Sequence, residues 1–151
     1  MGAGLRATAL ALGCLTLAGE ARATAQSASV PASGTVGGLP EGVVFSGNVQ
    51  LRSTLVRDPD FGKPPTVQLA IDLVDLVGRG LRSGARYVTA AEFVQRVEID
   101  ANEAIELTFA FQPQSRKGHL VARAACLALM LKFDARNGAI VGAACRIYGI
   151  E

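Results

Sequence analysis

The sequence predicts an all-β protein: an antiparallel β-sandwich of about six to seven strands, with one short helix as an optional addition. Three observations predict this fold class. Apolar and polar residues alternate in several segments, Gly- and Pro-rich connections separate those segments, and an Asn-Gly pair joins the last two. A small lipocalin-like β-barrel is the alternative, because short strands joined by turns build both architectures.

The first 25 residues have the order of parts that is typical of a secretory signal peptide. Arg6 precedes an apolar stretch over residues 7–18, small residues follow, and cleavage is expected after Ala25. An alternative interpretation makes Cys14 the lipid-modified N-terminus of a lipoprotein. The signal peptide predicts an exported protein, periplasmic or extracellular.

Composition divides the rest of the chain into two parts. Residues 26–42 are rich in Ser, Gly, Pro and Ala, so we expect a flexible leader. Residues 43–151 are expected to fold as a single β-rich domain. The apolar stretch of the signal is too short to span a membrane and no later one is long and uncharged enough, so no transmembrane segment is predicted.

The charge balance argues against a nucleic-acid partner. The chain has 15 Lys and Arg against 13 Asp and Glu, and removal of Arg6, Arg22 and Glu20 with the signal leaves a net charge of +1. A broad basic surface is therefore not expected. The chain also has no Trp and only two Tyr, so it lacks the aromatic platforms on which single-stranded nucleic acids stack.

Three segments have the clearest strand pattern. In residues 43–56 and 104–111 every second residue is mostly apolar, as in an antiparallel strand with one solvated face. Residues 66–77 begin with the same alternation, but the pattern slips near Val74, where we expect a β-bulge. A Pro-rich connection at residues 57–65 separates the first of these strands from the second.

Residues 78–84 are expected to form a loop or sharp bend, and residues 85–99 fit two structures. Thr89 and Glu92 have the spacing of a capping box, in which Thr89 caps a helix and Glu92 bonds back to the backbone of Thr89. The same residues also fit a strand, with Phe93 and Val97 on one face. We expect a short helix over 89–97, with a strand as the alternative.

The C-terminal run 120–150 predicts a β-hairpin that turns at residues 134–138. Its first arm is apolar on both faces, so each face needs a cover unless the arm bends between two sheets. Cys126 and Cys145 lie on the two arms, and export would favour a disulfide between them. A four-residue loop places them diagonally on one face, near the distance limit for a bridge, so a disulfide and two free thiols both stay open.

Catalytic and metal-binding motifs are poorly represented. His119 is the only histidine, and we expect it at an exposed loop edge because no nucleophile motif accompanies it. Asp58, Asp60 and Gly62 form a weak calcium candidate, which an ordinary β-turn explains better. The sequence therefore predicts no metal site and no cofactor.

Paired carboxylates are the one remaining route to hydrolysis. Asp72 with Asp75, and Glu98 with Asp100, are the pairs that a glycoside hydrolase would need. Acidic residues on the outer faces of strands explain the same pattern without a cleft.

A loop with three arginines is the strongest candidate binding site. Arg79, Arg82 and Arg86 lie on the Gly-rich stretch 78–86, where guanidinium groups and main-chain N–H groups would meet a phosphate or carboxylate. The stretch lacks the Gly-Lys-Ser/Thr end of a phosphate-binding loop. We predict anion binding here, with an ordinary solvated loop as the alternative.

These observations favour an exported, non-enzymatic β-sandwich domain that has a binding or assembly role at the cell envelope. The first alternative is a carrier whose apolar C-terminal arms line a pocket for a lipid or another small apolar ligand. A carboxylate-based hydrolase is a distant second. The sequence specifies neither the envelope partner or ligand nor the oligomeric state.

Overall fold

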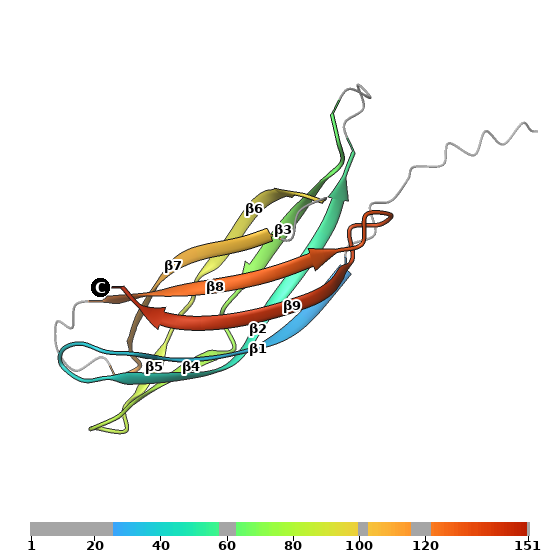
Figure 1. Ribbon diagram of the computed structural model, residues 1–151. Coiled ribbons are helices and arrows are strands. Elements are labelled where there is room, and N and C mark those ends of the chain that lie inside the picture. Colours follow the sequence, from blue (N-terminus) through green and yellow to red (C-terminus); the bar gives the residue numbers. More distant parts are fainter. Residues whose placement is uncertain (1–25, 58–62, 100–102, 116–121, 151) are drawn as a thin grey trace, which may run out of the picture.

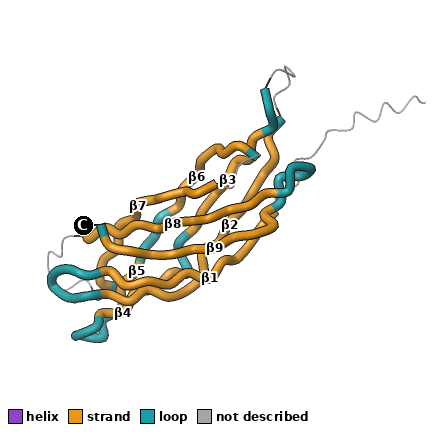
Figure 2. The backbone as a smooth tube through the Cα atoms, in the orientation of Figure 1, coloured by secondary structure: helices purple, strands orange, loops and turns teal. Residues whose placement is uncertain are grey.

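The computed structural model describes residues 26–57, 63–99, 103–115 and 122–150. These residues form nine strands and no helix, which confirms the all-β class (Figures 1 and 2). The strands are β1 (Gln26–Val36), β2 (Val43–Val56), β3 (Thr66–Asp72), β4 (Leu76–Gly80), β5 (Arg86–Val88), β6 (Glu92–Glu98), β7 (Glu103–Pro113), β8 (Arg123–Phe133) and β9 (Ile140–Gly149). The prediction of a short helix over 89–97 is wrong, because β6 occupies most of it.

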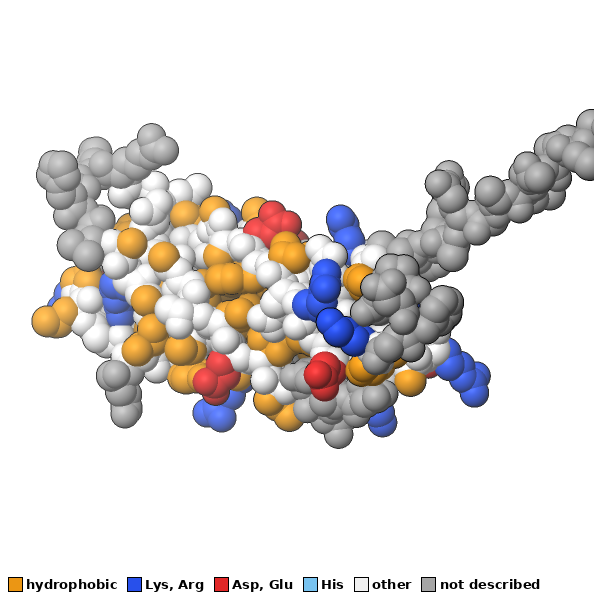
Figure 3. Space-filling model, turned by 90° about the horizontal axis from the view of Figure 1, so that it is seen from above, with side chains coloured by type: hydrophobic (Ala, Val, Ile, Leu, Met, Phe, Trp, Pro, Cys, Tyr) orange, Lys and Arg blue, Asp and Glu red, His pale blue; other side chains and the backbone are white. Residues whose placement is uncertain are grey.

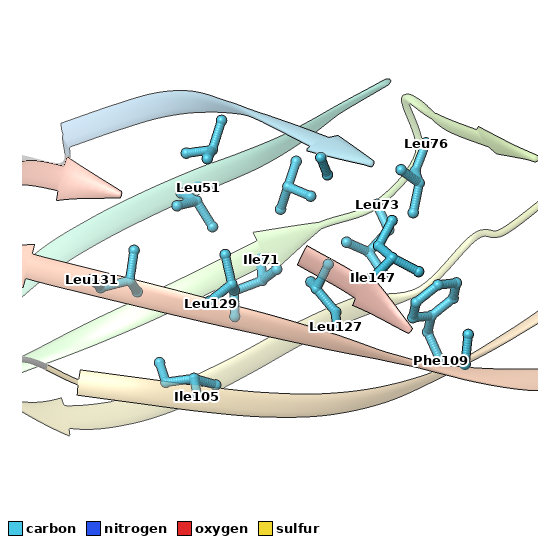
Figure 4. Close-up of a cluster of buried hydrophobic side chains, with 14 of the residues drawn as sticks. Leu51, Ile71, Leu73, Leu76, Ile105, Phe109, Leu127, Leu129, Leu131 and Ile147 are labelled. Atoms are coloured by element: carbon cyan, nitrogen blue, oxygen red, sulfur yellow. The ribbon is translucent and has the colours of Figure 1, made fainter. Parts of the chain in front are cut away.

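The strands belong to one mixed sheet in the order β1-β9-β8-β7-β5-β4-β2-β3-β6. β1 also pairs with β2, so the chain of paired strands returns to its start, and β3 and β6 extend it beyond β2. Only β1 and β9 run parallel. Figure 1 shows β7, β8 and β9 passing in front of β2 and β3, and buried side chains lie between the two groups (Figure 4).

The alternating residues of the strands build the core. Leu127, Leu129 and Leu131 on the inner face of β8 are at most 2% exposed. At one end of the core, the ring of Phe45 from β2 packs edge-on against two rings from β7, with centroids 5.8 Å from Phe109 and 5.0 Å from Phe111. The two strands that periodicity predicted most clearly, β2 and β7, thus pack against each other through their apolar faces.

The prediction of a flexible leader over residues 26–42 is wrong for its first part, because residues 26–36 form β1. β1 pairs along its whole length with β2, and its inward positions include Val30, Ala32 and Val36, which are buried. Gly34 lies so close to β9 that a methyl group there would be 2.0 Å from the Ile147 carbonyl oxygen. Small residues are therefore what allows β1 to pair between two strands.

The β-bulge predicted near Val74 takes the form of a tight turn that adds one residue, since β2 advances from Gln50 to Gly47 while the paired strand advances from Asp72 to Leu76. Leu73 and Leu76 are both buried on its two sides, Val74 is 61% exposed, and the Leu76 N–H donates to the Leu73 carbonyl at 3.0 Å. The strand then resumes as β4, so the loop predicted over 78–84 begins only after Gly80. The expected count of six to seven strands is too low partly because the segment predicted as one strand from residue 66 forms β3 and β4, and because the expected leader contributes β1.

The C-terminal hairpin is confirmed, with Asp134 and Ala139 joined across a four-residue loop by an N–H···O bond of 2.8 Å. Gly138 has φ of 70°, which a glycine adopts without strain. Beyond the loop, Phe133 pairs with Ile140 but Lys132 pairs with Gly142, so β9 carries one extra residue. This bulge shifts the register of the two arms by one residue.

Replacing Phe45 with Ala is expected to lower the free energy of unfolding by about 3–5 kcal/mol, because it removes the ring that joins β2 to β7 and leaves a cavity. Urea unfolding followed by circular dichroism measures the loss. Val44→Ala is the matched control, since Val44 neighbours Phe45 on the exposed face, and it is expected to cost less than about 1 kcal/mol. Equal losses in the two variants would contradict this description of the core.

Candidate functional site

The turn between β4 and β5, which contains Arg82, holds the carboxylate of another residue of the protein. Glu41, between β1 and β2, accepts hydrogen bonds from the main-chain N–H groups of Arg82 at 2.8 Å and Ser83 at 2.7 Å, and from the Tyr87 hydroxyl at 3.2 Å. A side chain on Gly80 would lie 2.4 Å from this carboxylate. The hydrogen bonds, above all that from the Ser83 hydroxyl, lower the pKa of Glu41 to about 2.

Two arginines hold the main chain around Glu41. Arg123 of β8 donates to the carbonyls of Glu41 at 2.7 Å and Gly37 at 2.5 Å, and its guanidinium lies 5.1 Å from the centre of the Phe111 ring. The Arg82 guanidinium donates to the Pro40 carbonyl at 2.8 Å. We call this arrangement the Glu41 clasp, since it fastens the β1–β2 connection to the β4–β5 turn and to β8.

The three predicted anion-binding arginines have two different environments in the structure. Arg79 on β4 and Arg86 on β5 are cross-strand partners, and both side chains are exposed. Arg82 lies in the turn beyond them and takes part in the Glu41 clasp. Binding of a soluble anion by Arg79 and Arg86 stays a prediction.

A second candidate surface is the outer face of β7, β8 and β9, which we call the small-residue face. Its side chains are mostly small and uncharged: Ala104, Thr108 and Ala110 on β7, Ala124, Cys126, Ala128 and Met130 on β8, and Ala144 on β9. The β8 side chains on this face are exposed or partly buried, and Met130 is 53% exposed. Within the described residues, no strand covers this second apolar face of β8.

One row that carries charges crosses the small-residue face. Glu106, Ala128 and Arg146 form one row across the three strands, with the alanine in the middle. Figure 3, which views the molecule from above, shows hydrophobic side chains among uncharged groups, with Lys, Arg, Asp and Glu side chains between and around them. The small side chains of β7, β8 and β9 let another protein approach this face closely, while the charges at the two ends of the row orient it.

A groove of about 810 Å³ opens at the end of the small-residue face, where β1, β8 and β9 meet. It is lined by Thr35, Gly37, Gly38, Cys126, Tyr148, Gly149 and Ile150. Tyr148 is cross-strand partner to Cys126, and its hydrogen bond to Glu106, followed by burial, raises the pKa of Tyr148 to about 12. The phenol therefore stays neutral and offers an aromatic surface beside the exposed side chain of Ile150.

The two cysteines are free thiols on opposite faces of the hairpin. Because of the bulge in β9, Cys126 faces Tyr148 instead of the expected Ile147, and Cys145 faces Leu129 on the inner side. A shift of one residue moves a side chain to the other face of the sheet. The disulfide between Cys126 and Cys145 that the sequence left open is therefore absent, for a geometric reason.

Of the predicted carboxylate pairs, Asp72 and Asp75 lie at the turn after β3, whereas Glu98 ends β6. Asp72 accepts from the Val74 main-chain N–H at 2.8 Å, and Asp75 accepts from the Gln50 side chain at 3.0 Å. The structure brings no acid–base pair together in an enclosed cleft at these residues.

Several predictions lie outside the described residues: the signal peptide with Cys14, the calcium candidate at 58–62, the carboxylate of Asp100, and His119. Among the residues that the structure describes, no group of three or more His, Cys, Asp or Glu side chains is arranged to hold a metal ion. The described chain also contains no helix long and apolar enough to cross a membrane.

A smaller cleft of about 290 Å³ opens between residues 88–91, which connect β5 to β6, and residues 110–112 of β7. It is lined largely by Ala90, Ala91, Ala110 and Phe111, with Thr89 at one side. The Thr89 hydroxyl is buried without a protein hydrogen-bond partner. The leucines of β8, which the carrier hypothesis placed around a pocket, pack into the core instead. Among the described residues, an apolar ligand would therefore fit this cleft better than the C-terminal hairpin.

The chain matches no protein-family model, and it has no significant match among curated proteins or solved structures.

Sequence reasoning missed three residues of these surfaces. Glu41 is the only acid between residues 26 and 57, which was a signal that it has a specific partner. Arg123 and Tyr148 gave no such signal, because their partners come from other strands through long-range pairing.

Glu41→Gln is expected to lower the melting temperature by several degrees at neutral pH. Because the pKa of Glu41 falls from 4.5 to about 2 on folding, the carboxylate stabilises the fold fully above pH 4.5 and loses this effect as the pH drops toward 2. The difference between wild type and variant, measured by thermal unfolding across pH 2–7, should shrink over that window. Glu98→Gln, at an exposed carboxylate, serves as the control. A difference that does not change with pH would contradict the clasp.

Alkylation at pH 8 is expected to modify Cys126 in the native protein and to spare Cys145. Burial raises the pKa of Cys145 to about 11, so only about one molecule in a thousand carries its reactive thiolate at that pH. Intact mass measures the labelling, and the Cys126→Ser variant should stay unmodified while Cys145→Ser reacts as wild type does. After unfolding without reductant, both thiols should react, and the absence of label would reveal a disulfide.

Proposed function

We propose that the protein is an exported, non-enzymatic domain that binds a protein partner at the cell envelope through the small-residue face and its groove. The observation that carries the proposal is the uncovered outer face of β8. A strand with apolar side chains on both faces is stable in water when a partner covers the second face, and large exposed apolar surfaces typically mark interaction sites.

The chemistry of the surface supports a protein partner over a small polar substrate. Alanines leave the sheet flat and accessible, so a sheet or an extended segment can approach closely. Tyr148 and Ile150 beside the groove are the bulky side chains of the kind that supply most of the binding energy at interfaces. Glu106 and Arg146 at the two sides favour a partner with the reverse order of charges.

The envelope location rests on the N-terminal segment and on the proposed export. The proposal of a non-enzymatic role rests on the use of the candidate catalytic groups elsewhere: Asp72 and Asp75 accept hydrogen bonds within the turn after β3. Hydrolytic activity of the purified mature protein would overturn this part of the proposal.

A photo-crosslinking amino acid at Ala124, expressed in the native cell, is expected to give one discrete adduct with another envelope protein. The matched control places it at Gln68, which is exposed on β3 outside the small-residue face, and should give no such adduct. The partner identified in the adduct, once purified by itself, should bind the wild-type protein. Ala124→Arg should raise the dissociation constant of that complex at least about tenfold, because the interface would bury a charge. An equal yield from both positions, or an adduct only with a second copy, would contradict the proposal.

A further inference from the structure

The edge of the sheet at β6 has no strand partner among the described residues. β6 pairs with β3 on one side only. β7, although it follows β6 in the chain, pairs with β8 and β5 instead. An unpaired edge presents N–H and C=O groups that can bond to another strand.

The register identifies which groups of β6 are available. The Leu73 N–H donates to the Ala91 carbonyl at 3.1 Å, which makes residues 73 and 91 a hydrogen-bonded pair in line with the β3–β6 ladder. Hydrogen-bonded and non-bonded pairs alternate along an antiparallel ladder. Residues 93, 95 and 97 therefore bond to β3, and Glu92, Val94 and Arg96 direct their main-chain groups toward the open edge.

The same three residues carry their side chains on the exposed face. Val94 is 58% exposed, and Glu92 and Arg96 are exposed on its two sides. The edge thus presents the sequence acid–valine–base at every second position, which becomes complementary to itself when one copy is reversed.

We propose that β6 pairs antiparallel with β6 of a second copy, with Val94 opposite Val94. In this register the main-chain groups of Glu92, Val94 and Arg96 bond across the edge, and Glu92 of each copy lies beside Arg96 of the other. The result is a two-fold symmetric contact in which the same strand serves both copies. The sheet then continues from one molecule into the next.

The charges select this register over its neighbours. A shift by two residues in one direction places Glu92 opposite Glu98, and a further shift places Arg96 opposite Arg96, both of which repel. A register with Arg96 opposite Glu98 also pairs opposite charges, but it pairs only the last residues of β6 and leaves Glu92 and Val94 without a partner strand. The register centred on Val94 is the one that combines opposite charges with pairing along most of β6.

This inference is independent of the partner proposed for the small-residue face, since it uses a different edge. Sedimentation equilibrium of the mature protein at micromolar concentration is expected to give a dimer. Glu92→Arg and Arg96→Glu should each raise the dissociation constant at least about tenfold by placing like charges together, and the double variant should restore the dimer. Glu98→Arg on the same strand is the control and should leave the dimer intact.

A second variant tests the main-chain bonds. Val94→Pro removes an N–H that points away from β3, so the fold should survive, with an unchanged circular dichroism spectrum, while the dimer is lost. A wild-type monomer throughout the micromolar range would overturn the inference, and so would a double charge reversal that does not restore association. Either result leaves the crosslink from Ala124 unaffected, so the two proposals fail separately.

Discussion

Register is the constraint on which the surfaces of this protein depend. A strand that is buried on one face sends alternate side chains inward, so a shift of one residue exchanges core and surface. In the C-terminal hairpin the extra residue of β9 makes that shift. It sends Ile147 inward, where it is 2% exposed, and turns Tyr148 toward the groove. The groove, the neutral phenol and the separation of the two thiols all follow from this one bulge.

The strands that the sequence predicted well are those with large apolar residues at every second position. β2, β7 and β8 have this pattern, and their apolar faces supply half of the buried core residues. β1 was missed because its inward residues are small: Val30, Ala32 and Gly34 alternate correctly, but the Ser-rich composition around them resembles a linker. Their small size is a tertiary requirement, since β1 passes close to β9, and no local pattern reveals that.

The two interpretations of residues 89–97 show how pairing overrides local preference. Thr89 and Glu92 have the spacing of a capping box, and an isolated segment would gain from it. In the folded chain β6 pairs with β3 along its whole length, which satisfies main-chain groups and buries Val97 in the core. Tertiary packing contributes more than one helix cap, so the strand wins.

Anion binding by Arg79, Arg82 and Arg86 stays a prediction, and the turn that contains Arg82 already holds a carboxylate of the protein itself. A Gly-rich turn with free N–H groups does attract a carboxylate, but Glu41, 41 residues away from Arg82, fills it. Sequence reasoning treats a loop as open to solvent, because the segment that covers it is distant in the chain. Here that segment had been assigned as a leader, so the error in β1 caused the error at the site.

The edge of β6 and the small-residue face differ in how they would exclude wrong binding partners. An exposed sheet edge commonly carries charges that prevent pairing with other strands. In β6 the charges have both signs at a spacing of four residues, so the register centred on Val94 pairs opposite charges along most of the strand, whereas shifts of two or four residues toward Glu98 bring like charges together. The small-residue face has charges in a single row, with Glu106 and Arg146 on either side of Ala128, and its selectivity comes from that row and from the shape of the groove beside Tyr148. An edge with specific charges suits a contact between identical copies, whereas a flat face with a groove suits a partner of different shape.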